Sequence, residues 1–538
     1  MQHTYLRYEC ADAFGITASS ASSKAPQSNS ILAVCNNGRQ QGHNMPQPIV
    51  LTTAGSVCMG FHLRTTIPTI KIGHREQLSG GVGTGKALNS DQLVCIDVIQ
   101  PEQGERNQNS GGITKVATGW VDGAVRIFDV YPDEFNNQSG GGYGLIQTLL
   151  HEYSSNEHED FIMREPLVLN GHSSSPIRTV SFCQKTKTRL ASGSSDGSVV
   201  LWDIIAETGL FRLLGHRGGI TDIQFANLRQ SSGSTGVDDY LITSSLDGLV
   251  KVWDLNGQCC TQTIPNHKGE VWGIACQTVP SLSTSQKSIK ATGNNDDDDS
   301  QEEERVRMLT GSNDGQVRVW SVHRPKRSQA QKVSDEEDGN QDGDSQDVSV
   351  GVDNTQSTQD DIDTVCSYMG PLVRPPNVAT SSERISCIHF HPNGRYVGIL
   401  HANSRNVDIY VIRSVQESMR KKQRRLRRRK EKSKLSSKQA TEASKASGKG
   451  NKRGLLDDPE SEEEHPNSAP ESTLEQSLDP EMIKASDEFE YYATARASHK
   501  VKGFVFVNVK EKGSGIRVVC ALSTNALETH SLIRKKER

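Results

Sequence analysis

Histidine, a hydroxyl residue and aspartate recur together along the chain, and these are the side chains of a hydrolytic triad. In such a triad the imidazole is the base, the hydroxyl is the nucleophile and the carboxylate orients the imidazole. His172, Ser192 and Asp196 form one set, and a second set begins at His216. A catalytic centre occurs once in a domain, whereas this set repeats. We therefore interpret the sets as a folding device, with no catalytic residue among them.

An aromatic residue completes each set at a fixed distance. In three sets the hydroxyl residue, Asp and Trp are separated by the same four and six positions. Indole N–H, hydroxyl, imidazole and carboxylate can form one hydrogen-bonded chain inside a sheet. The predicted chains are His172, Ser192, Asp196 and Trp202; His216, Thr243, Asp247 and Trp253; and His267, Thr310, Asp314 and Trp320. A fourth set, His74, Thr118, Asp122 and Phe128, ends in a ring without an N–H, which predicts a weaker network.

The elements that must hold these side chains are short strands joined by tight turns. In the clearest copy, residues 190–203, the turn Asp196-Gly197 precedes alternating apolar residues that suit a strand. Gly-His pairs such as Gly215-His216 stand upstream. This pattern is typical of the WD40 repeat, whose copies build the blades of a β-propeller.

The predicted fold class is all-β, a single seven-bladed WD40 β-propeller over residues 1–538 with long disordered or helical insertions. Weaker blades are expected beside the clear ones, because a closed ring leaves no unpaired sheet edge. Residues 4–17 are expected to pair with the last blade as a closing strand. The blades are predicted at about 30–64, 70–130, 167–204, 212–255, 263–322, 383–413 and 495–533.

Charge is strongly segregated along the chain, although the net charge is only −4. Apolar residues make up 33% of the sequence, a low share that indicates long polar insertions. Acidic, disordered insertions are predicted at 281–305 and 325–380, and a basic and then acidic insertion at 414–490. A solvated spacer is the simplest role for the acidic stretches, and Ser334 resembles an acidophilic kinase site.

Cysteine usage and hydropathy limit the class of protein. Eleven cysteines without a Cys-x-x-Cys pair indicate reduced core thiols rather than disulfides or a zinc site. No run of eighteen apolar residues and no apolar leader occur, so no membrane association is expected. Gly80–Lys86 resembles a phosphate-binding loop, but Ala87 stands where the magnesium-ligating hydroxyl is needed. No cofactor and no small-molecule substrate are expected.

The basic part of the third insertion has a distinctive composition. Eleven of the fifteen residues from Arg420 to Lys434 are Lys or Arg, without Gly or Pro, which favours an exposed helix. Such a helix suits phosphate contact or nucleolar retention; a solubilising role and a partner-docking helix are the alternatives. The candidate RNA-contact or nucleolar-signal residues are Arg420, Lys421, Lys422, Arg424, Arg425, Arg427, Arg428, Arg429 and Lys430. No aromatic residue is interleaved with them, which argues against base stacking.

Several longer runs resemble one family more closely than the general repeat. These are Tyr5–Tyr8, the run Gly119–Phe128, and the run Trp202–Leu213 that leads into Gly215-His216. They resemble the WD repeat-containing protein 3 family. The resemblance implies a nucleolar component of the U3 small nucleolar ribonucleoprotein, the small-subunit processome, which supports 18S ribosomal RNA maturation. Implied partners are other WD40 proteins of the processome, U3 small nucleolar RNA and pre-ribosomal RNA. Members of that family also carry a second propeller and a C-terminal domain, which are expected to be absent from these 538 residues.

A rigid ring with several edges suits a non-enzymatic assembly scaffold better than an enzyme. The alternative is a substrate receptor of a cullin-type ubiquitin ligase, or another generic WD40 scaffold. That receptor class favours Arg two positions beyond a Trp-Asp pair. This chain has Ile205 after Trp202-Asp203 and Asn256 after Trp253-Asp254. The absence of these arginines argues against the receptor, and the resemblance to the WD repeat-containing protein 3 family implies the ribosome-biogenesis scaffold, located in the nucleus and nucleolus.

Overall fold

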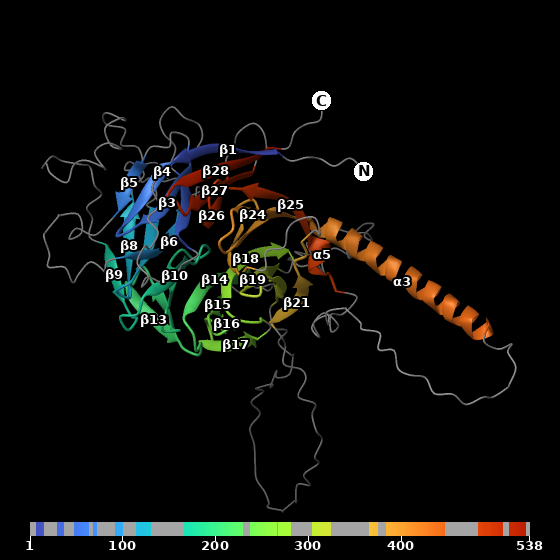
Figure 1. Ribbon diagram of the computed structural model, residues 1–538. Helices are drawn as coiled ribbons and strands as arrows, with labels where there is room; N and C mark the ends of the chain where they lie inside the picture. Colours follow the sequence, from blue (N-terminus) through green and yellow to red (C-terminus); the bar gives the residue numbers. More distant parts are fainter. Residues whose placement is uncertain are drawn as a thin grey trace, which may run out of the picture.

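The computed structural model describes residues 7–14, 30–36, 48–63, 68–72, 92–100, 114–130, 166–229, 237–265, 267–280, 304–323, 365–374, 383–446, 482–508 and 516–533. These residues form seven four-stranded sheets. The predicted all-β, seven-bladed propeller is confirmed, with one long helix added to it (Figure 1).

Every sheet is antiparallel and is written here from the ring centre outward. The first three sheets are β2 (Leu32–Asn36), β3 (Pro48–Ala54), β4 (Val57–His62), β5 (Pro68–Ile72); β6 (Leu93–Ile99), β7 (Thr114–Trp120), β8 (Ala124–Val130), β9 (Leu167–Asn170); and β10 (Ile177–Phe182), β11 (Arg189–Ser194), β12 (Val199–Asp203), β13 (Thr208–Leu213). The next two are β14 (Ile220–Arg229), β15 (Val237–Ser245), β16 (Val250–Asp254), β17 (Cys259–Ile264); and β18 (Val271–Pro280), β19 (Glu304–Ser312), β20 (Val317–Val322), β21 (Cys366–Pro371). The last two are β22 (Ile385–Phe390), β23 (Tyr396–His401), β24 (Asn406–Ile412), β25 (Phe489–Arg496); and β26 (Val501–Val507), β27 (Ile516–Leu522), β28 (Leu527–Ile533), β1 (Arg7–Phe14).

The innermost strands close the ring. Each of β2, β6, β10, β14, β18, β22 and β26 contacts the innermost strand of the next sheet, and β26 contacts β2. The outer edge of the seventh sheet comes from the other end of the chain, because β1 pairs antiparallel with β28 from Arg7 opposite Ile533 to Phe14 opposite Leu527. This pairing lies within residues 4–17, the segment expected as a closing strand.

The predicted blade ranges differ from the observed sheets by about one strand. Residues 70–72 and 167–170 were predicted to open the second and third blades, yet they are the outermost strands of the first and second sheets. The sixth sheet takes its outermost strand from residues 489–496. The predicted third blade begins with the strand before Gly171-His172, and that strand is the outer edge of the second sheet. The third sheet begins only with the strand after this turn, at Ile177, and this offset explains the difference.

The insertions are also partly structured, which corrects the two predicted acidic ranges and agrees with the helix expected from Arg420. Residues 366–371 form β21 inside the predicted 325–380 insertion, and residues 304–305 belong to β19 rather than to the 281–305 insertion. The 414–490 insertion contains helix α3 (Val415–Ala446) and the short helix α5 (Ala485–Glu488). Residues 281–303, 325–364 and 447–481, and the Gly80–Ala87 loop, lie outside the described residues.

Hydrophobic clusters lie between neighbouring sheets rather than at the ring centre. Ile127 of the second sheet shares a cluster with Phe182 of the third, and Val252 of the fourth shares one with Met308 of the fifth. Each sheet is therefore packed against the next through a shared apolar core.

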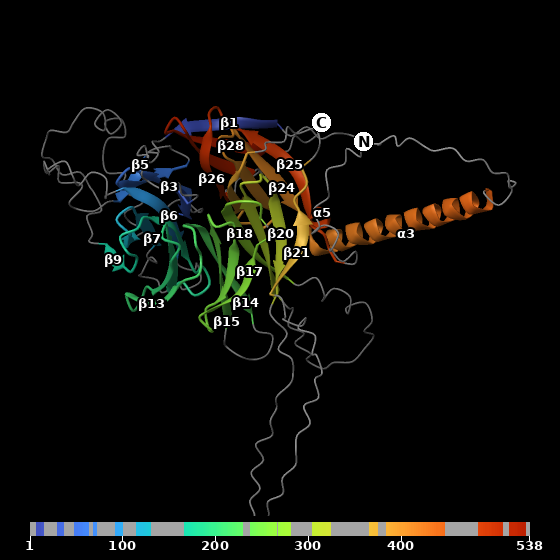
Figure 2. The same cartoon turned by 60° about the horizontal axis from the view of Figure 1, so that its bottom comes forward.

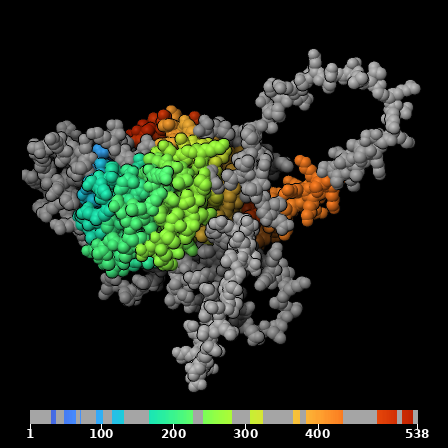
Figure 3. Space-filling view, turned by 90° about the horizontal axis from the view of Figure 1, so that it is seen from below, coloured from blue at the N-terminus to red at the C-terminus, as the bar shows by residue number. Residues whose placement is uncertain are grey.

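Helix α3 projects away from this ring. It has 32 residues and is therefore about 48 Å long. Figures 1 and 2 show it leaving the rim beside β21 and β25, with α5 at its base, and Figure 3 shows it protruding from the globular body. No helix in the described part of the chain is long and apolar enough to cross a membrane.

Candidate functional site

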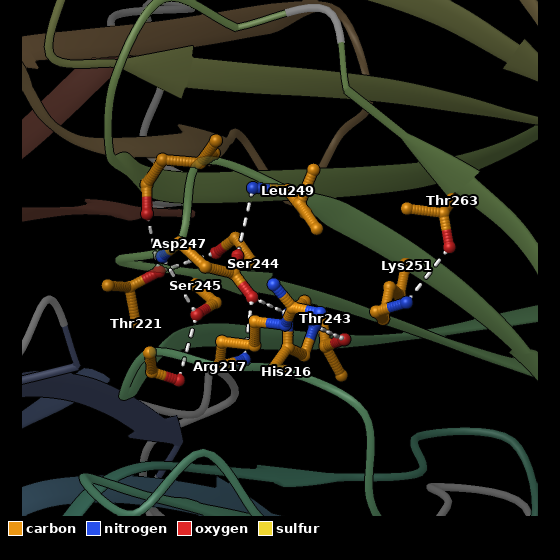
Figure 4. A network of polar contacts seen from close by, with 12 residues as sticks. His216, Arg217, Thr221, Thr243, Ser244, Ser245, Asp247, Leu249, Lys251 and Thr263 are labelled. Carbon is orange, nitrogen blue, oxygen red and sulfur yellow. Dashed lines mark hydrogen bonds and ion pairs between the residues drawn. The ribbon is translucent and has the colours of Figure 1, made fainter.

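The fourth sheet contains the complete predicted network, and Figure 4 shows three of its members, His216, Thr243 and Asp247. The Trp253 indole Nε1–H donates to Thr243 Oγ1 at 2.9 Å, and Thr243 Oγ1 lies 2.8 Å from His216 Nε2. His216 Nδ1 lies 2.9 Å from Asp247 Oδ2. Burial lowers the pKa of His216, so the ring is neutral, donates from Nδ1 to the carboxylate and accepts the Thr243 hydroxyl at Nε2.

The same aspartate also closes the turn that positions the network. Asp247 Oδ1 accepts the backbone N–H of Leu249 at 2.9 Å. Gly248 between them has φ +81°, and a Cβ there would lie 3.0 Å from the carbonyl oxygen of Gly269. The Asp-Gly pair is therefore required by the backbone conformation as well as by the hydrogen bonds.

In the third sheet a serine stands between the histidine and the aspartate. His172 Nε2 and the Trp202 indole both lie 2.8 Å from Ser192 Oγ, as predicted by the spacing. His172 Nδ1, however, lies 3.0 Å from Ser198 Oγ, which donates to Asp196 at 2.6 Å. The direct contact between His172 and Asp196 is therefore absent, and burial lowers the pKa of His172 to about 4.

In the fifth sheet an arginine takes that intermediate place. His267 Nε2 and the Trp320 indole lie 2.8 and 2.9 Å from Thr310 Oγ1. Arg318 Nη1 donates to His267 Nδ1 at 2.9 Å, and Arg318 Nη2 pairs with Asp314 at 2.8 Å. Burial and the charge of Arg318 lower the pKa of His267 to about 3. His267 is thus a neutral acceptor at Nδ1, which requires its proton on Nε2.

In the second sheet another indole stands where Phe128 has no N–H to donate, and the weaker network expected there stays a prediction. Trp120, at the end of β7, donates its indole N–H to Thr118 Oγ1 at 2.8 Å and so replaces the missing donor. Asp122 pairs with Arg126 at 2.7 Å, and the Arg126 guanidinium lies 4.6 Å from the Trp120 ring. His74 lies outside the described residues.

These networks stabilise the sheets. The hydroxyl residues Ser192, Thr243 and Thr310 are fully buried. Each accepts an indole N–H inside its own sheet, so no substrate can approach the oxygen. The described residues contain no group of three or more side chains able to hold a metal ion. The catalytic interpretation of the His, Ser or Thr, and Asp sets therefore has no geometric support.

Two aspartates, the half-buried Asp97 and the buried Asp222, join neighbouring sheets and were not predicted. Asp97 on β6 accepts the backbone N–H of Phe182 on β10 at 2.7 Å. Asp222 on β14 accepts the N–H of Ile274 on β18 at 3.0 Å. Burial raises the pKa of Asp97 to about 6 and that of Asp222 to about 7. An Asp in an apolar strand was the only available sequence signal.

The base of α3 is attached to the ring through α5. Arg425 pairs with Asp487 at 2.9 Å, and Lys421 Nζ donates to the carbonyl of Ser486 at 2.7 Å. Beyond these, Glu488 is 1% exposed and pairs with Arg305 and Arg307 of the fifth sheet. The helix is therefore held by side chains that are themselves anchored in the ring.

This attachment divides the predicted basic residues into two groups. Lys421 and Arg425 are engaged by α5, and their assignment as RNA contacts stays a prediction. Lys422 is half-buried, and the others are exposed: Arg420, Arg424, Arg427, Arg428, Arg429 and Lys430. The prediction missed the division because Asp487 lies 62 residues beyond Arg425 in sequence.

The family of WD domains with G-beta repeats matches residues 164–203, 208–254 and 258–321. The chain carries WD40 repeats. U3 small nucleolar RNA-associated protein 12 of Saccharomyces cerevisiae is 33% identical over 118 residues, 16% of this chain and 12% of that protein. Telomerase protein component 1 of Mus musculus is 32% identical over 120 residues, 22% of this chain and 4% of that protein.

A third relative matches over a longer stretch. The Schizosaccharomyces pombe homologue of U3 small nucleolar RNA-associated protein 21 is 26% identical over 242 residues, 39% of this chain and 26% of that protein. The chain spans about a quarter or less of the length of each of these relatives. The matches support the repeat, and two of the three relatives are named for association with U3 RNA.

Proposed function

We propose that this protein is a non-enzymatic WD40 scaffold subunit of the U3 ribonucleoprotein, the small-subunit processome, and supports pre-ribosomal RNA processing and small-subunit production. The observation that carries the proposal is the basic helix fixed to a rigid WD40 ring, in a chain whose relatives include proteins named for association with U3 RNA. The ring supplies faces for protein partners, and the helix supplies positive charge for RNA phosphates. Localisation to the nucleolus follows from this role.

Affinity purification from nuclear extract tests the proposal. The tagged chain should recover U3 RNA, pre-ribosomal RNA and other WD40 proteins of the processome. Recovery of a cullin and its adaptor without these RNAs would favour the alternative substrate-receptor function. Depletion of the protein should lower 18S ribosomal RNA relative to the large-subunit RNAs, and an unchanged ratio would contradict the proposal.

A further inference from the structure

A cleft of about 740 Å³ lies where α3 leaves the ring. The lining includes Arg395 and Val411 from the sixth sheet, one face of α3, and Ser486 and Asp487 of α5. The cleft is therefore built from the ring and from both described helices of the insertion.

The cleft carries an excess of positive charge. Seven Lys or Arg side chains line it, against three carboxylates. Each carboxylate is already engaged: Glu417 accepts the backbone N–H of Ser414 at 3.0 Å, Asp487 pairs with Arg425, and Glu490 pairs with Arg413. The remaining positive charge is thus not neutralised by the acidic groups of the lining.

Four guanidinium groups remain for a ligand. Arg413, Lys421 and Arg425 donate to α5 or to the strand after it. The side chains of Arg395, Arg420, Arg424 and Arg428 are exposed and make no hydrogen bond or ion pair with any residue that the structure describes.

Three of these four arginines form a row along the helix. Arg420, Arg424 and Arg428 are four residues apart, so they share one face of α3 at intervals of about 6 Å along its axis. The ties from Lys421 and Arg425 to α5 fix the orientation of this face relative to Arg395 on the ring. Because the helix backbone is already fixed, only the arginine side chains have to be ordered when a ligand binds.

We propose that this cleft binds the sugar–phosphate backbone of RNA, with Arg395 on one side and Arg420, Arg424 and Arg428 on the other. A guanidinium group can donate two parallel N–H bonds to the oxygens of one phosphate. Arginines spaced along a helix therefore suit the regularly spaced phosphates of an RNA backbone. No aromatic ring is among the residues that line the cleft, so the contact is independent of base sequence. The choice of RNA as the ligand rests on the proposed function. The cleft adds to that function the residues that would contact the RNA.

Fluorescence anisotropy with the full chain and a labelled random-sequence RNA, over a series of KCl concentrations, tests the cleft. The cleft variant combines Arg420→Gln, Arg424→Gln and Arg428→Gln. The slope of log affinity against log salt is negative, and each lost phosphate contact reduces its magnitude by about 0.7 to 0.9. The slope of the cleft variant should therefore be smaller in magnitude by about 2 to 3. The control, Lys422→Gln with Arg429→Gln and Lys430→Gln, makes the same charge change away from the cleft, and its slope should be smaller in magnitude by less than about 1.

Several outcomes would overturn the proposal. Equal losses in the two triple variants would show that RNA contacts the helix without preference for the cleft. No loss in the cleft variant, or displacement of RNA by an equimolar polyglutamate peptide, would exclude an RNA backbone site. Arg395→Gln alone, on the ring, should reduce the magnitude of the slope by about 0.7 to 0.9, and an unchanged slope would also contradict it. Recovery of U3 RNA by the unaltered chain tests the proposed function separately.

Discussion

The carboxylate of Glu488 ties the end of the insertion to the fifth sheet, and its removal should destabilise the propeller. Its side chain is 1% exposed and pairs with Arg305, also 1% exposed, and with Arg307 at 3.0 Å. In Glu488→Gln the amide keeps one neutral acceptor and turns N–H donors toward a guanidinium. Because two buried cations then lack a counter-ion, we expect a loss of about 3–5 kcal/mol in the free energy of unfolding.

Urea unfolding followed by tryptophan fluorescence measures this loss, since Trp320 lies on β20 of the same sheet. The control is Glu490→Gln, two residues away, where the carboxylate is 58% exposed and the expected loss is under about 1 kcal/mol. Adding Arg305→Met to Glu488→Gln should recover part of the loss, because it removes one unpaired cation. Equal, small losses for Glu488→Gln and Glu490→Gln would refute the reasoning.

Three further changes test the networks inside the sheets. Thr243→Val leaves a buried indole and imidazole unpaired and should cost about 2–4 kcal/mol in urea unfolding, against little for exposed Thr263→Val on the same sheet. Trp120→Phe removes the donor to Thr118 and should cost about 1–2 kcal/mol; an unaltered unfolding midpoint would contradict the role assigned to the indole. Because the pKa of His267 is lower in the folded protein, the unfolded chain binds the proton at a higher pH than the folded protein does. The contribution of His267 to stability is therefore complete above pH 6.5 and is lost as the pH falls toward 3. His267→Gln should therefore flatten the decline in stability below pH 6.5, by at most about 1.4 kcal/mol per pH unit, and a steeper decline would reverse the assignment.

The sequence predicted those features of the fold whose residues lie close together in the chain. The Asp-Gly turns and the spacing of Ser192 and Trp202 are properties of one hairpin, so a short stretch of sequence contains them. The partner of each aspartate was harder to predict, although a signal existed. Arg126 and Arg318 each stand four residues after the turn aspartate, and both pair with it.

Contacts between distant segments could not be predicted from one sequence. Arg305 and Glu488 are 183 residues apart, and nothing in the composition around either residue marks the other. The exposed helix from Arg420 was predicted from charge and propensity alone. Its division into ring contacts and free guanidinium groups depends on where α5 lies, which is set by the ring topology.

Pairing of β1 with β28 has a consequence for biosynthesis. More than 500 residues separate the end of β1 from the start of β28, so at 5–20 residues per second the ribosome needs about 25–100 s to supply the partner. During that interval β1 is a strand edge without its neighbour, and such edges invite pairing with other chains. The sequence of β1 contains the charged residues Arg7, Glu9 and Asp12. Charged side chains on an edge strand disfavour pairing with other chains, so we expect them to limit aggregation of the nascent chain.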